Sequence, residues 1–231
     1  MERVDPFKFP AGSTLKKFEN TIFEVGEHRF RPTRILSENW YNNQRKGEFE
    51  GENVGTGEAV IVKLRVETDP FLLSKEEQEQ TVRRSLEVFR RECRVFEKAS
   101  PSGYTPRYIT HTELEQDDKF EFPSGYLGIL VLAKYYTNKY PDIVTDATRK
   151  GNIVESEMPE LIEQFEDMAV RRQGIKHGGG APVDIEFDTQ SRRLYMVDPF
   201  NMEEIEPHEA DLADLGELRA VKRHLTKYGF K

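Results

Sequence analysis

The chain has 231 residues, 36% of them hydrophobic and 33% charged, which suits one large domain or two small lobes with a heavily solvated surface. Its formal net charge of -8 argues against nucleic-acid binding, because phosphate contacts need clustered lysines and arginines. The single cysteine, Cys93, excludes an internal disulfide and a cysteine-based metal site. No secretory signal is apparent, and the longest apolar run, residues 126–133, is too short to cross a bilayer. We therefore expect a soluble, intracellular, cytoplasmic protein that does not bind membranes.

The first part of the chain predicts three strands. They are expected over residues 31–41, 48–53 and 59–66, with a polar turn after the first and a glycine-containing turn at residues 55–57 after the second. Side chains alternate between the two faces of a strand. In residues 59–66 the most apolar stripe therefore lies on one face, which we expect to be buried, and Lys63 projects from the opposite face.

Residues 74–99 predict the clearest helix. Ser74 offers an N-terminal cap and is followed by an acidic first turn. Apolar residues then recur at steps of four and three, and they are Val82, Leu86, Phe89, Cys93 and Phe96. The later sequence predicts a strand over residues 126–136, a helix over 159–172, a short strand over 194–197 and a final helix over 211–227.

Glu92 lies at the edge of the apolar face of this helix. A carboxylate in that position is costly unless a cation meets it, and Lys63 on the preceding strand is an available partner. The alternative interpretation is that Glu92 extends into water and that Lys63 is an ordinary surface lysine of the strand.

Four segments, in chain order, resemble the motifs of eukaryotic protein kinases. Residues 56–63 resemble the strand that ends in a V-A-I-K-type lysine, and residues 91–96 resemble the helix whose glutamate pairs with that lysine. Residues 173–185 resemble the catalytic loop, and residues 194–200 resemble the strand that leads into D-F-G. The order and spacing agree from about residue 30 to residue 200. The chain is also similar to small kinase-like proteins of fungi.

The resemblance implies an α+β, two-lobed protein-kinase-like fold. Residues 1–135 would form an N-lobe with an antiparallel sheet and the helix 74–99, residues 136–231 a shortened helical C-lobe, and both together one compact kinase-like unit. The resemblance further implies a set of ligand-binding positions, which are Lys63, Glu92, Ile61, Ala133, Tyr135 and Gly179. It implies metal ligands at Asp184 and Asp198 and a role for His177 in holding the loop. His177, Asp184 and Asp198 are also the candidate catalytic residues, as acid–base groups.

Several departures from the family pattern predict that the chain is not an active protein kinase. Gly179 stands where the family has its catalytic aspartate, and glycine has no side chain that can orient a proton. The first two strands are not joined by a G-x-G-x-x-G loop. Ile61 replaces the small alanine that lies against adenine. Only 33 residues follow Asp198, which leaves no room for a normal activation segment.

Three functions stay open at this point. The first is a pseudokinase that binds a protein partner or a small ligand without turnover. The second is a repurposed enzyme that isomerises or cyclises a small apolar metabolite, with His177, Asp184 or Asp198 as acid–base groups. The third is a residual ATP-dependent phosphotransferase that binds magnesium weakly. The cofactor stays undetermined, and His177, Asp184 and Asp198 each also have a purely structural interpretation.

Overall fold

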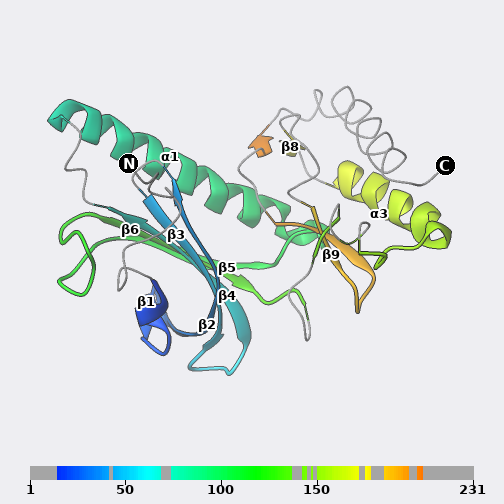
Figure 1. Ribbon diagram of the computed structural model, residues 1–231, viewed down its shortest axis with the longest axis horizontal. Coiled ribbons are helices and arrows are strands. Elements are labelled where there is room, and N and C mark those ends of the chain that lie inside the picture. Colours follow the sequence, from blue (N-terminus) through cyan, green and yellow to red (C-terminus); the bar gives the residue numbers. More distant parts are fainter. Residues whose placement is uncertain are drawn as a thin grey trace, which may run out of the picture. The chain divides into compact units, whose positions relative to one another are not determined.

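The computed structural model describes residues 15–41, 44–68, 74–136, 142–144, 147, 150–171, 175–177, 185–197 and 202–204 (Figure 1). The chain divides into two compact units, residues 1–93 with 108–134 and residues 94–107 with 135–231. The described residues confirm a mixed α+β fold with an antiparallel sheet and few helices. The two-lobed arrangement and the expected boundary at residue 135 stay predictions. No described helix is long and apolar enough to span a membrane.

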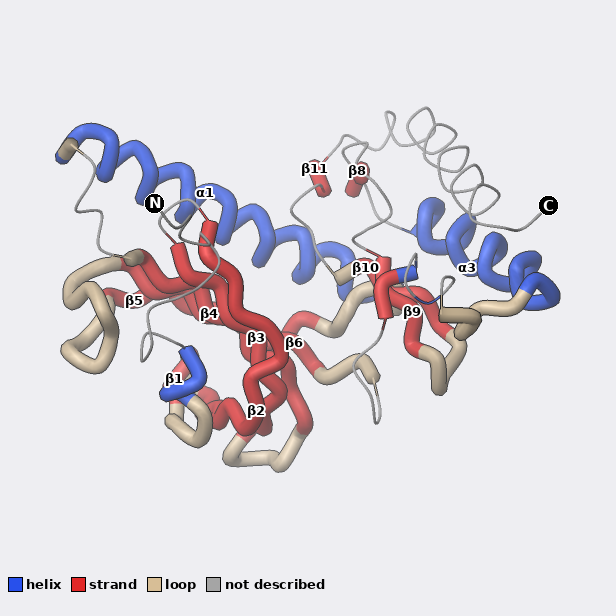
Figure 2. The backbone as a smooth tube through the Cα atoms, in the orientation of Figure 1, coloured by secondary structure: helices blue, strands red, loops and turns tan. Residues whose placement is uncertain are grey.

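The first unit contains an antiparallel sheet of six strands (Figure 2). In spatial order they are β1 (Phe23–Val25), β2 (His28–Tyr41), β3 (Gln44–Asn53), β4 (Ala59–Glu67), β6 (Tyr126–Ala133) and β5 (Tyr108–Glu115). The three strands predicted in the first part of the chain are confirmed as β2, β3 and β4, and the first two are longer than expected. β6 ends at Ala133, three residues earlier than predicted, and β1 and β5 were not predicted.

The turn between β3 and β4 fixes the register of these two strands. The side-chain oxygen of Asn53 accepts hydrogen bonds from the backbone N–H groups of Gly55 at 2.9 Å and Thr56 at 3.3 Å. Gly57 donates its own N–H to the Asn53 carbonyl at 2.7 Å and has φ of 73°, a conformation that favours glycine. The resulting ladder places Lys63 directly opposite Glu48.

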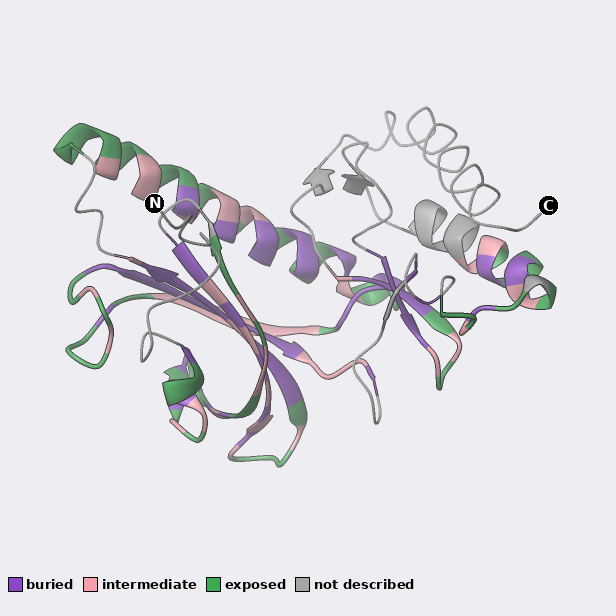
Figure 3. Cartoon of the chain, viewed as in Figure 1, coloured by how far each residue is buried: buried purple, intermediate pink, exposed green. Residues whose placement is uncertain are grey.

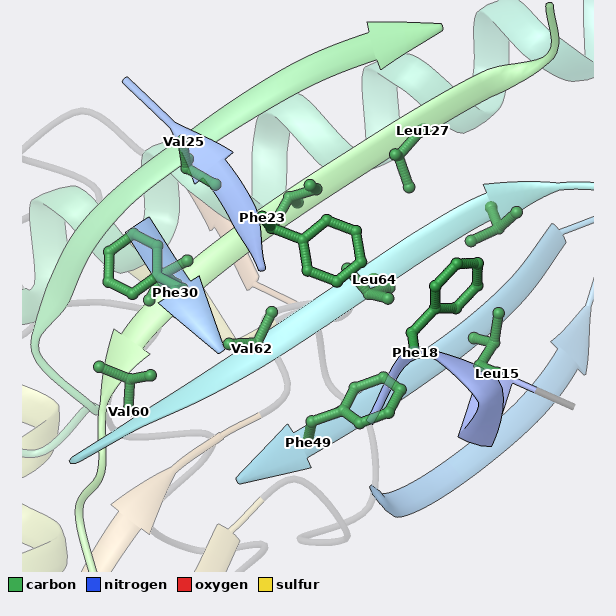
Figure 4. Packing of buried hydrophobic residues seen from close by; sticks show 13 residues of the cluster. Leu15, Phe18, Phe23, Val25, Phe30, Phe49, Val60, Val62, Leu64 and Leu127 are labelled. Carbon is green, nitrogen blue, oxygen red and sulfur yellow. The ribbon is translucent and has the colours of Figure 1, made fainter. Parts of the chain in front are cut away.

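The face of β4 that was predicted to be buried lies in an apolar core. Val60, Val62, Leu64 and Val66 are at most 3% exposed. The 3-10 helix η1 (Leu15–Phe18), β1 and the start of β2 supply the opposite side of this core, with Phe18, Phe23 and Phe30 close to the apolar side chains of β3 and β4 (Figure 4). The sequence preceding β3 therefore closes one face of the sheet.

Helix α1 (Lys75–Ala99) covers the other face of the sheet (Figure 1). A Cβ atom on Gly128 of β6 would lie 3.0 Å from the ring of Phe89, so glycine lets the helix approach the strand closely. Phe89 and the sheet residues Ile61, Leu130 and Leu132 are completely buried. The neighbouring strands β4 and β6 are consequently buried on both faces along most of their length (Figure 3), which explains the nearly continuous apolar run of β6.

Local hydrogen bonds define where α1 begins. The Ser74 hydroxyl accepts from the N–H of Glu77 at 3.3 Å, and the Glu77 carboxylate accepts from the N–H of Ser74 at 2.9 Å. This reciprocal pair confirms Ser74 as the predicted N-cap. At the other end, the 3-10 helix η2 (Ser100–Ser102) follows directly, and Gly103 has φ of 76°. The helix therefore ends at Ala99, the residue at which the sequence predicted its end.

The second unit contains two small sheets and a helix. The first sheet has the order β10 (Arg193–Met196), β9 (Ile185–Asp188) and β7 (Asp142–Ile143), and the second pairs β11 (Met202–Glu204) with β8 (Ile175–His177). Helix α3 (Met158–Arg171) follows the 3-10 helix η3 (Glu155–Glu157). The expected helix 159–172 and strand 194–197 are confirmed to within one residue, whereas the predicted helix 211–227 lies outside the described residues.

The second unit has one apolar core, which is formed by residues of α1, α3 and the β9–β10 hairpin. Val95 and Ala99 of α1 lie in this cluster with Leu161 of α3 and Phe187 of β9. The N–H of Met196 also donates to the carbonyl of Tyr104 at 2.8 Å. The end of α1 and the segment after it thus anchor the hairpin that immediately precedes residue 198.

Candidate functional site

Strand β4 presents Ile61, Lys63 and Arg65 on the face that α1 covers. Directly paired residues of antiparallel strands point to the same face, so their partners complete the surface. The partners on β3 and β6 are, in the same order, Glu50, Glu48 and Lys46, and Leu132, Leu130 and Gly128. Charged side chains therefore gather on the β3 side of this face, and apolar ones on the β6 side.

Glu92 of α1 reaches this surface and contacts two cations. Its carboxylate is 3% exposed and lies 3.5 Å from Lys63, measured from Oε1 to Nζ. Arg65 contacts the other oxygen: its Nε donates to Oε2 at 2.7 Å, and its Nη2 contacts the same atom. The Lys63–Glu92 contact that the kinase resemblance implies is present, and Glu92 does not extend into water.

The charges around Glu92 keep it ionised. Burial by itself would raise the pKa of this carboxyl group, but the positive charges of Arg65 and Lys63, the hydrogen bond from Arg65 and the charge of Lys46 together lower its pKa below the ordinary value. A buried charge of this kind is tolerated only when it is paired and hydrogen-bonded. The ion pairs therefore fix α1 to β4 through an ionised carboxylate.

Arg65 is the residue of this cluster that sequence reasoning missed. The signal was present in the strand alternation, which places residues 63 and 65 on the same face, two positions apart. The kinase motif predicted only a lysine as the partner of Glu92, because that motif has a single cation on the strand. A guanidinium suits a buried carboxylate better than an ammonium does, since it is more weakly hydrated and presents several donors.

Two further polar groups lie close to the Glu92 cluster, and both stay protonated at neutral pH because burial raises their pKa values. Burial raises the pKa of the Cys93 thiol, which is 1% exposed, and the charge of Glu92 acts in the same direction. Burial likewise raises the pKa of the Tyr126 phenol. Cys93 therefore belongs to the core, as the helical pattern indicated, and offers no reactive thiolate.

The remaining predicted ligand-binding residues are distributed over both units. Ile61 is completely buried and Ala133 is half-buried in the first unit. Tyr135 belongs to the second unit, where its hydroxyl donates to Glu186 at 2.7 Å and its ring lies 5.1 Å from that of Tyr195. The structure brings together Lys63, Glu92 and Ile61 on one face of one unit. The ligand role of all these residues stays a prediction.

The predicted acid–base and metal residues are only partly described. His177 ends β8 and pairs with Met202 of β11. Gly179, Asp184 and Asp198 lie outside the described residues, so their predicted roles stay predictions. Within the part of the chain that the structure describes, no group of three or more histidine, cysteine, aspartate or glutamate side chains is arranged to bind a metal ion.

Gly47 and Gly51, which lie where kinases have the G-x-G-x-x-G loop that this sequence lacks, are both inside β3. A Cβ atom on Gly47 would lie 2.6 Å from a methyl carbon of Leu15, and one on Gly51 would lie 2.6 Å from the carbonyl oxygen of Arg31. Both glycines are therefore explained by close packing of β3 against its neighbours, as expected for glycines within a strand.

Comparison with known proteins gives a distant structural neighbour. No protein-family model matches the chain, and neither does any curated protein sequence. Among solved structures, the chain is similar to the crystal structure of the BubR1 kinase domain, with 16% sequence identity and a TM-score of 0.47. The match covers 80% of this chain and 51% of that kinase domain, so the chain spans about half its length. Likeness at this level assigns neither a family nor an activity.

Proposed function

We propose that this chain is a catalytically degenerate kinase-like protein, a pseudokinase, that binds a protein partner or a small ligand and does not transfer phosphate. The observation that supports it most is the double pairing of Glu92, which is buried and bound by Arg65 as well as by Lys63. An ion pair that serves nucleotide binding in kinases serves here to fasten a helix to a strand.

In protein kinases the strand lysine contacts the phosphates of ATP, and the helix glutamate keeps that lysine in place. Here Arg65 is the nearer partner of Glu92, and Lys63 lies 3.5 Å away. The carboxylate therefore no longer depends on Lys63 for its charge compensation. The contact between strand and helix can therefore be kept in a protein that has lost nucleotide binding, as expected of a pseudokinase.

The residues described around Lys63 do not fit a magnesium–nucleotide complex. The position that is a small alanine beside adenine in kinases is Ile61, which is completely buried. Lys63 also pairs across the ladder with Glu48, a carboxylate that repels phosphate. The sequence supplies the remaining argument, because Gly179 cannot act as the base that orients an attacking hydroxyl group.

We expect the melting temperature of the purified chain to be unchanged by millimolar ATP with magnesium. A ligand that binds the folded state must raise stability by mass action, by about 2.7 kcal/mol at a concentration of 100 Kd. Differential scanning fluorimetry of the wild type, Lys63→Met and Lys119→Met tests this, since Lys119 is an exposed lysine of the β5–β6 turn. A rise of several degrees that Lys63→Met abolishes and Lys119→Met preserves would show that magnesium–ATP binds at Lys63, and would contradict the interpretation that the residues around Lys63 do not fit it.

A further inference from the structure

Glu48 is the cross-strand partner of Lys63. The two residues are directly opposite in the β3–β4 ladder, and such pairs have Cβ atoms about 4.5–5.5 Å apart on the same face of a sheet. Both side chains are partly exposed, so they lie where the sheet surface meets solvent. An anion that approaches the Lys63 ammonium group must therefore also approach the Glu48 carboxylate.

Lys63 is bracketed by carboxylates from two elements. Glu92 of α1 lies 3.5 Å from its ammonium nitrogen. Glu48 lies opposite Lys63 on the neighbouring strand β3. The charge of Glu92 is shared, since Arg65 and Lys46 act on it together with Lys63. Three cations, Lys63, Arg65 and Lys46, thus act on the one carboxylate of Glu92, and the ladder places the carboxylate of Glu48 opposite Lys63 as a second negative charge on this face.

The next acidic residue of the same strand face has other cationic partners. Glu50 lies 2.8 Å from Arg34 and 2.9 Å from Lys134 through its two carboxylate oxygens. It is opposite Ile61 in the ladder and not opposite a cation. Glu48 is therefore the acidic residue of β3 whose position in the sheet couples it to Lys63.

We propose that Glu48 excludes phosphate-bearing ligands from Lys63 and so determines the specificity of this face. The inference rests on the proposed function and deepens it: whatever binds near Lys63 presents a neutral or cationic group and not a polyphosphate. Charge repulsion of this kind acts on the phosphate chain itself. It is distinct from crowding by Ile61, which would act on the adenine ring alone.

Inorganic tripolyphosphate separates the two effects, because it carries the charge of the nucleotide without the base. We expect Glu48→Gln to lower the Kd for tripolyphosphate at least about tenfold relative to the wild type at low ionic strength, since an opposing charge near the ligand is removed. Isothermal titration of the full chain measures this. The gain should shrink as salt is raised, and it should be lost again in Glu48→Gln/Lys63→Met.

Glu52→Gln is the matched control. Glu52 lies on the same strand and the same face, but it is opposite Ala59 and contacts Arg31. We expect Glu52→Gln to leave the Kd within twofold of the wild type. Glu48→Thr, which carries a strand-favouring residue, provides a second neutral variant in case the glutamine variant is poorly folded, and it should show the same gain.

The outcomes distinguish this inference from the proposed function. Equal Kd values for Glu48→Gln, Glu48→Thr and the wild type would overturn the role of Glu48 and leave the proposed function standing, and so would a gain of equal size in Glu52→Gln. Micromolar binding of tripolyphosphate by the wild type would also overturn it. The proposed function fails on a different readout, which is Lys63-dependent transfer of phosphate by the wild type.

Discussion

Replacing Arg65 with methionine is expected to lower the free energy of unfolding by about 3–5 kcal/mol, the cost of breaking a buried ion pair from one side. The variant would leave Glu92 at 3% exposure with Lys63 at 3.5 Å, and with the weaker effect of the Lys46 charge, to compensate it. Lys63→Met should cost less, about 1 kcal/mol, because Arg65 would still bind the carboxylate. Urea unfolding followed by fluorescence measures both, since Trp40 is the single tryptophan and lies in the same unit.

Arg90→Met is the control for this comparison. Arg90 also lies on α1 and pairs with Glu113 at 2.6 Å, but both side chains are partly exposed. Exposed pairs of this kind contribute about 0–1 kcal/mol. If Arg65→Met destabilised the protein no more than Arg90→Met does, the buried pair would not be what fastens α1 to the sheet. In the double variant Arg65→Met/Glu92→Leu most of the loss should be recovered, because no uncompensated buried charge remains.

The effect of Arg65→Met should also depend on pH in a defined direction. The pKa of Glu92 is lower in the folded protein than its ordinary value of 4.5. The stability that this carboxylate contributes is therefore fully present above pH 4.5 and is lost as the pH falls through the lower, folded-state pKa. The difference between the wild type and Arg65→Met should consequently shrink in acid. A constant difference from neutral pH down to pH about 2 would contradict this assignment.

Phe30→Ala is expected to destabilise the first unit by about 3–5 kcal/mol, the usual cost of truncating a buried phenylalanine. Phe30 is completely buried and belongs to the cluster in which η1, β1 and the start of β2 cover the apolar residues of β3, β4 and β6. The expected loss combines the lost burial of the ring with a cavity that the sheet, packed on both faces, cannot collapse. The same Trp40 fluorescence measurement applies.

Leu114→Ala provides the comparison for the Phe30 variant. Leu114 lies on β5 and is 44% exposed, so its truncation should change the free energy of unfolding by about 0.5 kcal/mol or less. If the two variants behaved alike, the segment from Leu15 to Phe30 would not close this face of the sheet. A large loss confined to Phe30→Ala agrees with a sheet that is covered on both sides.

The elements with strong periodic signals were predictable from the sequence. The alternation in residues 59–66 indicated the buried face of β4, and the spacing of apolar residues, with Ser74 as its cap, indicated α1. β1 was missed because it has only three residues, too few to show a period. β5 was missed because none of its side chains is fully buried and four consecutive polar residues, 110–113, interrupt its apolar residues, so it shows no alternation. Its position in the sheet comes from pairing with β6, which local sequence does not encode.

The candidate site was predictable in part. Lys63 and Glu92 could be paired because a cation and a carboxylate occupied compatible faces of successive elements. The sequence could not show that Arg65 lies closer to Glu92 than Lys63 does, because this depends on how closely α1 approaches the sheet at Gly128. The register that brings Glu48 opposite Lys63 depends on the hydrogen bonds of Asn53 and Gly57 in the β3–β4 turn. Strand alternation alone does not fix which residues face each other across two strands.

Transfer of labelled phosphate from ATP is the measurement that tests the central claim most directly. The wild type and Lys63→Met are incubated with labelled ATP, magnesium and either no acceptor, a mixed protein substrate or a panel of small alcohols. The expected result is no incorporation above that of Lys63→Met with any acceptor. Incorporation by the wild type that Lys63→Met abolishes, and that the conservative variant Lys63→Arg reduces, would contradict the account.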